Sequence, residues 1–154
     1  QLLLGTKTEL EGVEINEQAA RTCKVGTVHV VSIKDYIENN WRYTPWDEKA
    51  DREKRWDLVL TKGVLIHQSP NHLPAIYDLM YRASNRYIFI AEYYNPTPVE
   101  MEYRGHQGVM WKRDFAGELM DQHPDVKLVD TGFAYHRAPQ PRDDLTWFLL
   151  EKQP

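Results

Sequence analysis

Short apolar runs that end abruptly in polar residues recur along the chain and predict β-strands. The longest are apolar almost throughout, which is typical of parallel strands buried on both faces of a sheet. Residues 9–15 instead alternate between apolar and polar and end on an acid. Six strands are expected, over residues 9–15, 28–33, 56–61, 86–94, 126–135 and 145–151.

Helical patterns separate most of these strands. Asn16 can cap a short helix over residues 17–24. A second helix opens at Ser69-Pro70, because proline suits the first helical position. Asp114 can cap a third helix, and Pro124 follows its end. The second helix carries the stripe of a helix that packs on a sheet, formed by Leu73, Ile76, Tyr77, Met80 and Tyr81.

The connection over residues 95–113 is long for a small domain, and long connections of this kind are often functional. Apolar and polar residues alternate on both sides of a segment that holds Gly105 and Gly108. This pattern predicts a β-hairpin that forms a flap.

The order of elements favours an α/β fold with a mostly parallel sheet. The last two strands are joined by a short loop with no room for a helix, so they must form an antiparallel pair. A chain of 154 residues should form one domain, 1–154, with the flap at 95–113.

Composition excludes several classes of protein. The net charge is −4 and no large basic block occurs, which disfavours a general nucleic-acid binder. Cys23 is the only cysteine, so no intramolecular disulfide can form, and a reducing compartment is expected. No apolar run reaches the roughly 18 residues that a membrane span needs, and no signal peptide is visible. We therefore expect a cytoplasmic protein that does not enter a membrane.

Polar residues follow the third strand, where parallel sheets place their ligands. Thr61, Lys62 and Gly63 come at its end, and His67 follows a second short apolar run. The alternative is an ordinary turn from a strand into a helix. The pattern alone leaves both interpretations open.

Several segments together resemble one family. Residues 12–16 and 58–67 resemble the second and fourth strands of S-adenosylmethionine-dependent methyltransferases, whose sheets also end in an antiparallel pair. Five further segments resemble the pseudaminic acid biosynthesis-associated methylases: residues 90–96, 103–106, 112–119, 132–137 and 144–151. The resemblance implies a Rossmann-like, three-layer methyltransferase fold, S-adenosylmethionine as cofactor, and a role in bacterial surface-sugar synthesis of the pseudaminic acid type.

The chain departs from this family at its start. The family has a strand, a glycine-rich turn and a helix before the segment that contains Glu14. In this chain Gly5 is the only glycine before that segment, residues 12–16, so no glycine-rich turn precedes it. Residues 1–4 would correspond to the end of that helix, so an N-terminally truncated domain is expected. A sheet without its central strand would self-associate. The alternative is an inactive binding or assembly module. A nicotinamide-dependent enzyme is disfavoured by the paired terminal strands.

The resemblance assigns cofactor contacts to the ends of three strands. Glu14 would accept the ribose hydroxyls, as in dinucleotide folds, unless it is a solvated strand-end acid. Asp35 would either bind the adenine amine or cap a turn. Lys62 would pair with the cofactor's carboxylate, unless it is a surface lysine. The full set is Glu14, Ile15, Ser32, Ile33, Thr61, Lys62 and Gly63.

Methyl transfer needs a base only when the acceptor atom carries a proton to be removed. His67 and Glu92, which follow buried strands, are the candidates, although His67 could equally be structural. The flap carries cations that suit a small acidic sugar, and the alternative is a solvated hairpin. The acceptor-binding candidates are Tyr93, Tyr94, Asn95, Arg104, His106, Lys112 and Arg113. No metal site is assigned.

Overall fold

The computed structural model describes residues 8–24, 26–40, 55–139 and 143–154. The helix end expected over residues 1–4 lies outside these ranges. The chain divides into two compact units, residues 1–52 and 53–154, and each is described by itself.

The first unit is a β-α-β arrangement. Strand β1 (Glu11–Glu14) pairs in parallel with β2 (Thr27–Val30), and helix α1 (Glu17–Thr22) connects them. The Asn16 side chain accepts the first free amides of α1, which confirms the predicted cap. Helix α2 (Ile33–Asp35) and the π-helical turn η1 (Tyr36–Asn40) follow β2.

The strand expected over residues 28–33 is too long by three residues. It ends at Val30, and Ser32 is the N-cap of α2, accepting the Asp35 amide hydrogen at 3.0 Å. The β-branched pattern predicted a strand through Ile33. The capping preference of serine outweighs that pattern, because the hydroxyl satisfies a helix amide that would otherwise be free.

The second unit is built on a four-stranded sheet in the order β3-β4-β8-β7. Strands β3 and β4 are parallel, and β8 is antiparallel to both of its neighbours, β4 and β7. This confirms the predicted antiparallel pair at the end of the chain. The bounds are β3 (Trp56–Lys62), β4 (Ser84–Glu92), β7 (Val126–Ala134) and β8 (Leu145–Lys152).

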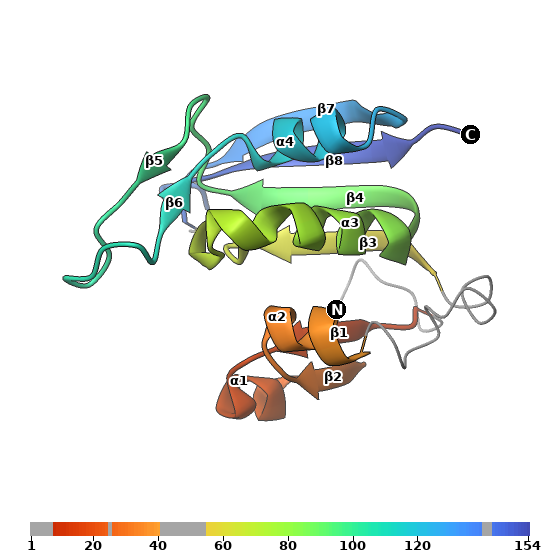
Figure 1. Cartoon of the computed structure of the whole chain (residues 1–154), viewed down its shortest axis with the longest axis horizontal. Helices are drawn as coiled ribbons and strands as arrows, with labels where there is room; N and C mark the ends of the chain where they lie inside the picture. The colour runs from red at the N-terminus through yellow and green to blue at the C-terminus, as the bar shows by residue number, and fades with distance from the viewer. Residues whose placement is uncertain (1–7, 25, 41–54, 140–142) are drawn as a thin grey trace. The chain divides into compact units, whose positions relative to one another are not determined.

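Two helices, α3 (Leu73–Ala83) and α4 (Phe115–Gln122), contact each other over one face of this sheet (Figure 1). They bury Ile88 and Ile90 of β4 and Leu150 of β8. The predicted stripe on α3 is buried except for Tyr81, which is half-buried. The short 3-10 turns η2 (Leu65–His67) and η3 (Pro70–His72) precede α3, so Pro70 opens a turn and the α-helix starts three residues later than expected.

The predicted β-hairpin is present between β4 and α4. Strands β5 (Val99–Glu100) and β6 (Trp111–Lys112) pair as an antiparallel hairpin, which lies beyond the carboxyl ends of β3 and β4 in Figure 1. Asp114 caps α4 by accepting the Gly117 amide hydrogen at 2.9 Å. Every helix in the described ranges is too short or too polar to cross a bilayer.

Aromatic packing joins the strands on the other face of the sheet. Phe89 of β4 stacks on Trp147 of β8, with ring centroids 5.9 Å apart. A Cβ at Gly132 would lie only 2.6 Å from Trp147 Cζ2, so the indole ring occupies the space that the glycine leaves. On the same face, Leu58 and Leu60 of β3 remain 46% and 60% exposed.

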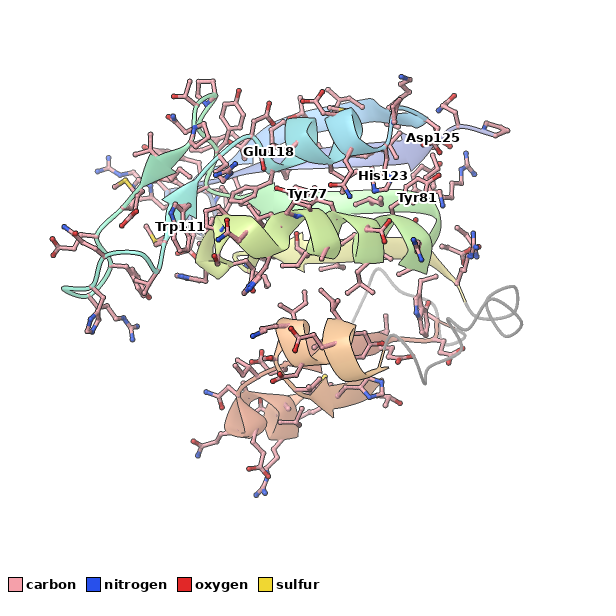
Figure 2. All side chains as sticks on the ribbon, viewed as in Figure 1. Tyr77, Tyr81, Trp111, Glu118, His123 and Asp125 are labelled. Carbon is pink, nitrogen blue, oxygen red and sulfur yellow. The ribbon has the colours of Figure 1, made fainter. Side chains whose placement is uncertain are left out.

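At the end of the sheet away from the hairpin, a compact polar cluster joins the sheet to the helices (Figure 2). The rings of Tyr81 and His123 stack in parallel at 4.0 Å, and the Tyr81 hydroxyl donates to Asp125 Oδ2 at 2.7 Å. Lys152 Nζ lies over the Tyr81 ring and donates to the carbonyl oxygens of Tyr81 and Ser84. Burial lowers the pKa of His123, because the ring would have to lose water in its charged form.

Stability is therefore expected to decrease as the pH falls below about 6.5, the ordinary pKa of an unfolded histidine. The folded His123 resists protonation, so the unfolded chain binds the extra proton more tightly and is favoured by acid. His123→Phe keeps a ring against Tyr81 and should reduce this acid sensitivity. Urea unfolding at pH 7.5 and 5.5 measures it, with the exposed His72→Asn as control. If both variants lose the same free energy of unfolding between pH 7.5 and 5.5, the acid sensitivity comes from groups other than His123.

Candidate functional site

A tight turn follows β3 and is bonded to the carboxyl end of the neighbouring strand β4. The Gly63 amide hydrogen is donated to the Ala91 carbonyl oxygen at 3.0 Å, which holds the two strand ends together. Gly63 has φ +63°, in the left-handed region that glycine adopts without strain. A Cβ built on Gly63 would meet no atom of the described residues within 4 Å, so the space beside this backbone is open.

A buried carboxylate lies beneath this turn. Glu92, at the end of β4, is only 2% exposed. Its Oε1 accepts the amide hydrogens of Val64 and Leu65 at 3.1 and 3.2 Å, and its Oε2 accepts that of Ile66 at 3.4 Å. Burial raises the pKa of Glu92, while the hydrogen bonds from these amides oppose the rise. The Thr61 hydroxyl oxygen is itself buried and makes no hydrogen bond within the described residues. Both Glu92 oxygens are thus engaged in holding the turn.

His67 connects the turn to the hairpin. Its Nδ1 is 2.9 Å from the Val109 carbonyl oxygen, and its ring lies 5.2 Å from the ring of Tyr103. The two contacts come from opposite strands of the hairpin. His67 therefore bridges two segments that are about 40 residues apart in the sequence.

The hairpin closes in a two-residue turn. Tyr103 and His106 exchange amide–carbonyl hydrogen bonds of 2.9 and 3.0 Å, and Arg104 and Gly105 between them have φ +53° and +80°. Two positive φ values are the signature of a type I′ turn, which matches the twist of paired strands. Nearby, Glu100 Oε1 accepts the Gly108 amide hydrogen at 2.6 Å.

The turn, the hairpin and the start of β8 line an open cavity of about 320 Å³ at the carboxyl ends of β3 and β4. Four lining residues were predicted as site residues from the sequence: Lys62, Gly63, His67 and Tyr93. Five were not: Ile66, Tyr103, Met110, Asp143 and Leu145. The predicted hairpin is a sequence signal for Tyr103 and Met110, which it places on opposite sides of its turn, and Tyr103 also begins the family-like segment 103–106.

Two of the predicted cations lie over rings that line the cavity. Lys112 Nζ is 5.6 Å from the centre of the Tyr93 ring, and Arg104 Cζ is 5.1 Å from that of Tyr103. Both distances are within the range of cation–π attraction. Burial raises the pKa of the Tyr93 hydroxyl, and the neighbouring carboxylate of Asp143 raises it further.

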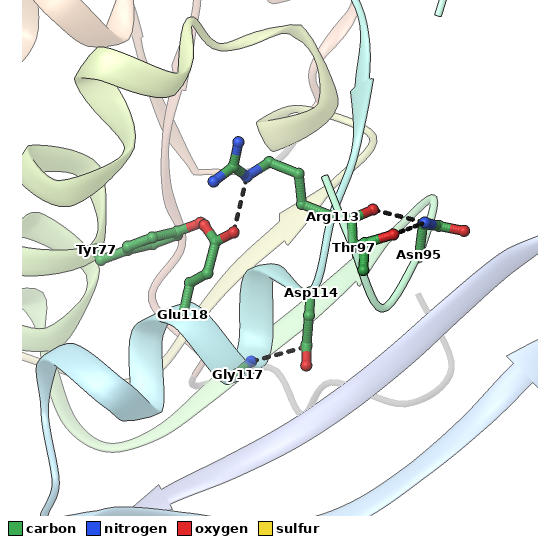
Figure 3. Close-up of polar contacts among 7 residues, drawn as sticks. All are labelled: Tyr77, Asn95, Thr97, Arg113, Asp114, Gly117 and Glu118. Atoms are coloured by element: carbon green, nitrogen blue, oxygen red, sulfur yellow. Dashed lines mark hydrogen bonds and ion pairs between the residues drawn. The ribbon is translucent and has the colours of Figure 1, made fainter. Parts of the chain in front are cut away.

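Two other predicted acceptor-binding residues are engaged in internal contacts (Figure 3). Arg113 Nε donates to Glu118 Oε1 at 2.8 Å, and the Tyr77 hydroxyl donates to the other oxygen of Glu118, also at 2.8 Å. Asn95 Nδ2 donates to the carbonyl and hydroxyl oxygens of Thr97. These contacts attach the ends of the flap to α4 and to its own loop.

Tyr94 and His106 also lie outside the cavity wall. The Tyr94 ring contacts the ring of Phe148 on β8, with centroids 5.7 Å apart. His106 is exposed and contributes backbone hydrogen bonds to the hairpin turn. Of the seven residues predicted to bind the acceptor, Tyr93 alone lines the cavity directly.

The remaining cofactor candidates lie in the first unit, at the ends of β1 and β2. Glu14 Oε1 accepts the Asn16 amide hydrogen at 2.8 Å, and Ile15 beside it is 72% exposed. The Ser32 hydroxyl donates to Asp35 Oδ2 at 2.7 Å. One carboxylate oxygen of Asp35 is therefore engaged by the N-cap residue of its own helix.

The sequence matches no protein-family model and no curated protein. Solved structures do match. The 1,6-didemethyltoxoflavin N1-methyltransferase of Burkholderia thailandensis, crystallised with 1,6-didemethyltoxoflavin and S-adenosylhomocysteine, aligns with a TM-score of 0.62 at 14% identity, over 94% of this chain and 61% of that one. An S-adenosylmethionine-dependent methyltransferase of Leishmania major aligns with a TM-score of 0.59 at 15% identity, over 91% and 54%. The Synechocystis magnesium protoporphyrin IX methyltransferase, with bound S-adenosylmethionine, aligns with a TM-score of 0.56 at 13% identity, over 94% of this chain and 60% of that one.

At these identities the similarity establishes the fold alone. The chain shares the Rossmann-like α/β fold of these S-adenosylmethionine-dependent methyltransferases, which confirms the main part of the predicted fold class. The expected N-terminal truncation stays a prediction. It spans 54–61% of the length of these three proteins.

Glu92→Leu is expected to destabilise the fold by about 2–4 kcal/mol, because the amide hydrogens of Val64, Leu65 and Ile66 lose their acceptor. Glu92→Gln should cost less, since the amide oxygen can still accept two of the three. Urea unfolding measures both variants. The exposed Glu102→Leu, in the flap, is the matched control and should stay within about 0.5 kcal/mol of the parent. Parent-like stability of Glu92→Leu would show that the turn does not depend on the carboxylate.

Proposed function

We propose that this chain carries out, or contributes to, methyl transfer from S-adenosylmethionine to a small acceptor. The observation that carries the proposal is the cavity at the carboxyl ends of β3 and β4, where Lys62, Gly63, His67 and Tyr93 come together. Folds of this class place ligands at this edge of the sheet.

The residues around the turn fit the methionine part of S-adenosylmethionine. Lys62 brings a cation to the cavity for the cofactor's carboxylate, and the open space beside Gly63 leaves room for close backbone approach. The Thr61 side chain is buried, so in this proposal Thr61 shapes the site only through the position of its backbone. When bound, the cofactor supplies an electrophilic methyl group and leaves as a neutral thioether. The protein's task is then to align the acceptor with that methyl group.

In the first unit, we assign the ribose to Glu14 and the adenine to Ile15, Ser32 and Ile33. Glu14 ends β1 with one carboxylate oxygen on the Asn16 amide, which leaves the other oxygen for a ribose hydroxyl. The high exposure of Ile15 leaves an apolar surface for a ring.

We further propose that the acceptor is a small acidic sugar of the pseudaminic acid type, used in bacterial surface glycans. Lys62 lines the cavity, and Arg104 and Lys112 lie over two of its aromatic rings, so these three cations outnumber the one lining carboxylate, Asp143, although the whole chain is acidic. Tyrosine rings suit the apolar faces of a sugar, and arginine suits its carboxylate. Arg113 and Asn95 support the flap in this scheme, because their side chains are already engaged.

Calorimetric titration of the full chain with S-adenosylhomocysteine tests the cofactor half of the proposal. Glu14→Ala is expected to weaken binding by about 1–3 kcal/mol, the scale of a lost charge-assisted hydrogen bond. Glu17→Ala, an exposed acid on the adjacent helix, is the control and should bind like the parent. If the parent does not bind S-adenosylhomocysteine, the chain alone is not a cofactor-binding methyltransferase, and a non-catalytic role is favoured.

Steady-state kinetics with labelled S-adenosylmethionine and N-acetylneuraminate as a probe sugar tests the acceptor half. Arg104→Ala should raise the KM for the sugar about tenfold, the effect of roughly 1.4 kcal/mol, and leave the KM for the cofactor unchanged. Arg104→Lys should recover only part of the loss if the contact is bidentate. Arg86→Ala, at the other end of β4, is the control. An unchanged KM for the sugar would make Arg104 an ordinary surface residue.

A further inference from the structure

The contact between His67 and the hairpin determines where the imidazole carries its proton. A carbonyl oxygen has no hydrogen to give, so in the 2.9 Å contact Nδ1 of His67 must donate and the oxygen of Val109 must accept. In the neutral ring the other nitrogen, Nε2, then has a free lone pair. Because His67 lines the cavity, Nε2 is the ring nitrogen left to a ligand there.

Hydrogen bonds made by neighbouring residues fix both partners, His67 and Val109, in place. On the side of His67, the turn η2 is fixed by the three amides bound to Glu92. On the side of Val109, Glu100 accepts the amide hydrogen of the preceding residue, Gly108, at 2.6 Å. The Met101 amide, which donates to the Met110 carbonyl at 2.9 Å, fixes the residue that follows Val109.

We propose that the hairpin is a positioning element for His67: the Val109 carbonyl holds the Nδ1–H tautomer and so makes Nε2 the base that takes a proton from the acceptor. The inference rests on the proposed methyl transfer and narrows the acceptor group to a hydroxyl. The acceptor oxygen–carbon bond forms, the carbon–sulfur bond breaks with its electron pair going to sulfur, and the hydroxyl proton goes to Nε2. Charge is balanced, since the sulfonium becomes neutral as the imidazole becomes cationic.

The position of the flap and the availability of the Nε2 lone pair are coupled in this arrangement. When the hairpin moves away, His67 loses the partner that fixes its proton, and the ring can place a hydrogen on Nε2, where it cannot accept another. Glu100 is therefore a positioning residue, because it acts on His67 only through Gly108 and Val109. The Tyr103 ring, 5.2 Å from that of His67, limits the ring's rotation.

Nitrogen NMR on the full chain, labelled with ¹⁵N-histidine, tests the proposal without any substrate. The parent should show His67 as the Nδ1–H tautomer at pH 8. Glu100→Ala should convert a large part of the population to Nε2–H or to an averaged signal, and Glu100→Gln should restore the parent pattern, because its amide oxygen still accepts from Gly108. Glu102→Ala, two residues along the same hairpin, should leave the His67 signal unchanged.

Kinetics with the probe sugar completes the test. Glu100→Ala should lower kcat about tenfold or more, within the range of general-base effects, and leave S-adenosylhomocysteine affinity within about twofold. A parent His67 in the Nε2–H form, or a tautomer insensitive to Glu100→Ala, would overturn the inference. A tautomer that responds to Glu100→Ala in a protein without methyl transfer would support the positioning of His67 and would overturn the proposed function.

Discussion

The buried carboxylate of Glu92 is the constraint on which the candidate site depends. A charge removed from water is costly, and here three consecutive backbone amides compensate for it. The carboxylate and the amides hold one another, so the turn after β3 cannot shift without leaving one of them unpaired. This interaction fixes where the backbone passes Gly63 and where His67 leaves the turn. The open space of the cavity is thus bounded by one of the more tightly held parts of the unit.

The flap is held by contacts that are more exposed to solvent than those of the turn. Its two strands are only two residues long each, and the Glu100–Gly108 and His67–Val109 hydrogen bonds are exposed to solvent. A rigid floor and a lightly held cover suit a site that must admit a ligand and then exclude water. Lys112 and Arg104 of the hairpin lie over the rings of Tyr93 and Tyr103. A local positive field can therefore form on a chain whose net charge is −4.

Most of the fold was predictable because each strand and helix carries its own periodic pattern. The stripe on α3 and the apolar run of β4 are local signals, and the structure has the expected helix and strand there, although β4 begins and ends two residues earlier than predicted. The errors lie at boundaries where two local preferences compete. Ser32 interrupts a β-branched run to cap a helix, and Pro70 starts a 3-10 turn before the α-helix begins at Leu73. The sequence shows both preferences there but not which one has the lower free energy.

The site was predictable only where it follows from strand ends. The rule that parallel sheets bind ligands beyond their carboxyl ends located Lys62, Gly63 and His67. Tyr103 reaches the cavity only because the hairpin folds back, and no local pattern gives that direction. Arg113 looked like the other flap cations, yet its guanidinium is paired with Glu118, in the first turn of α4. Acids are favoured in the first turn of a helix by the helix dipole. A cation just before a helix therefore has a carboxylate within reach, and it should be weighed as a structural residue before it is assigned to a ligand.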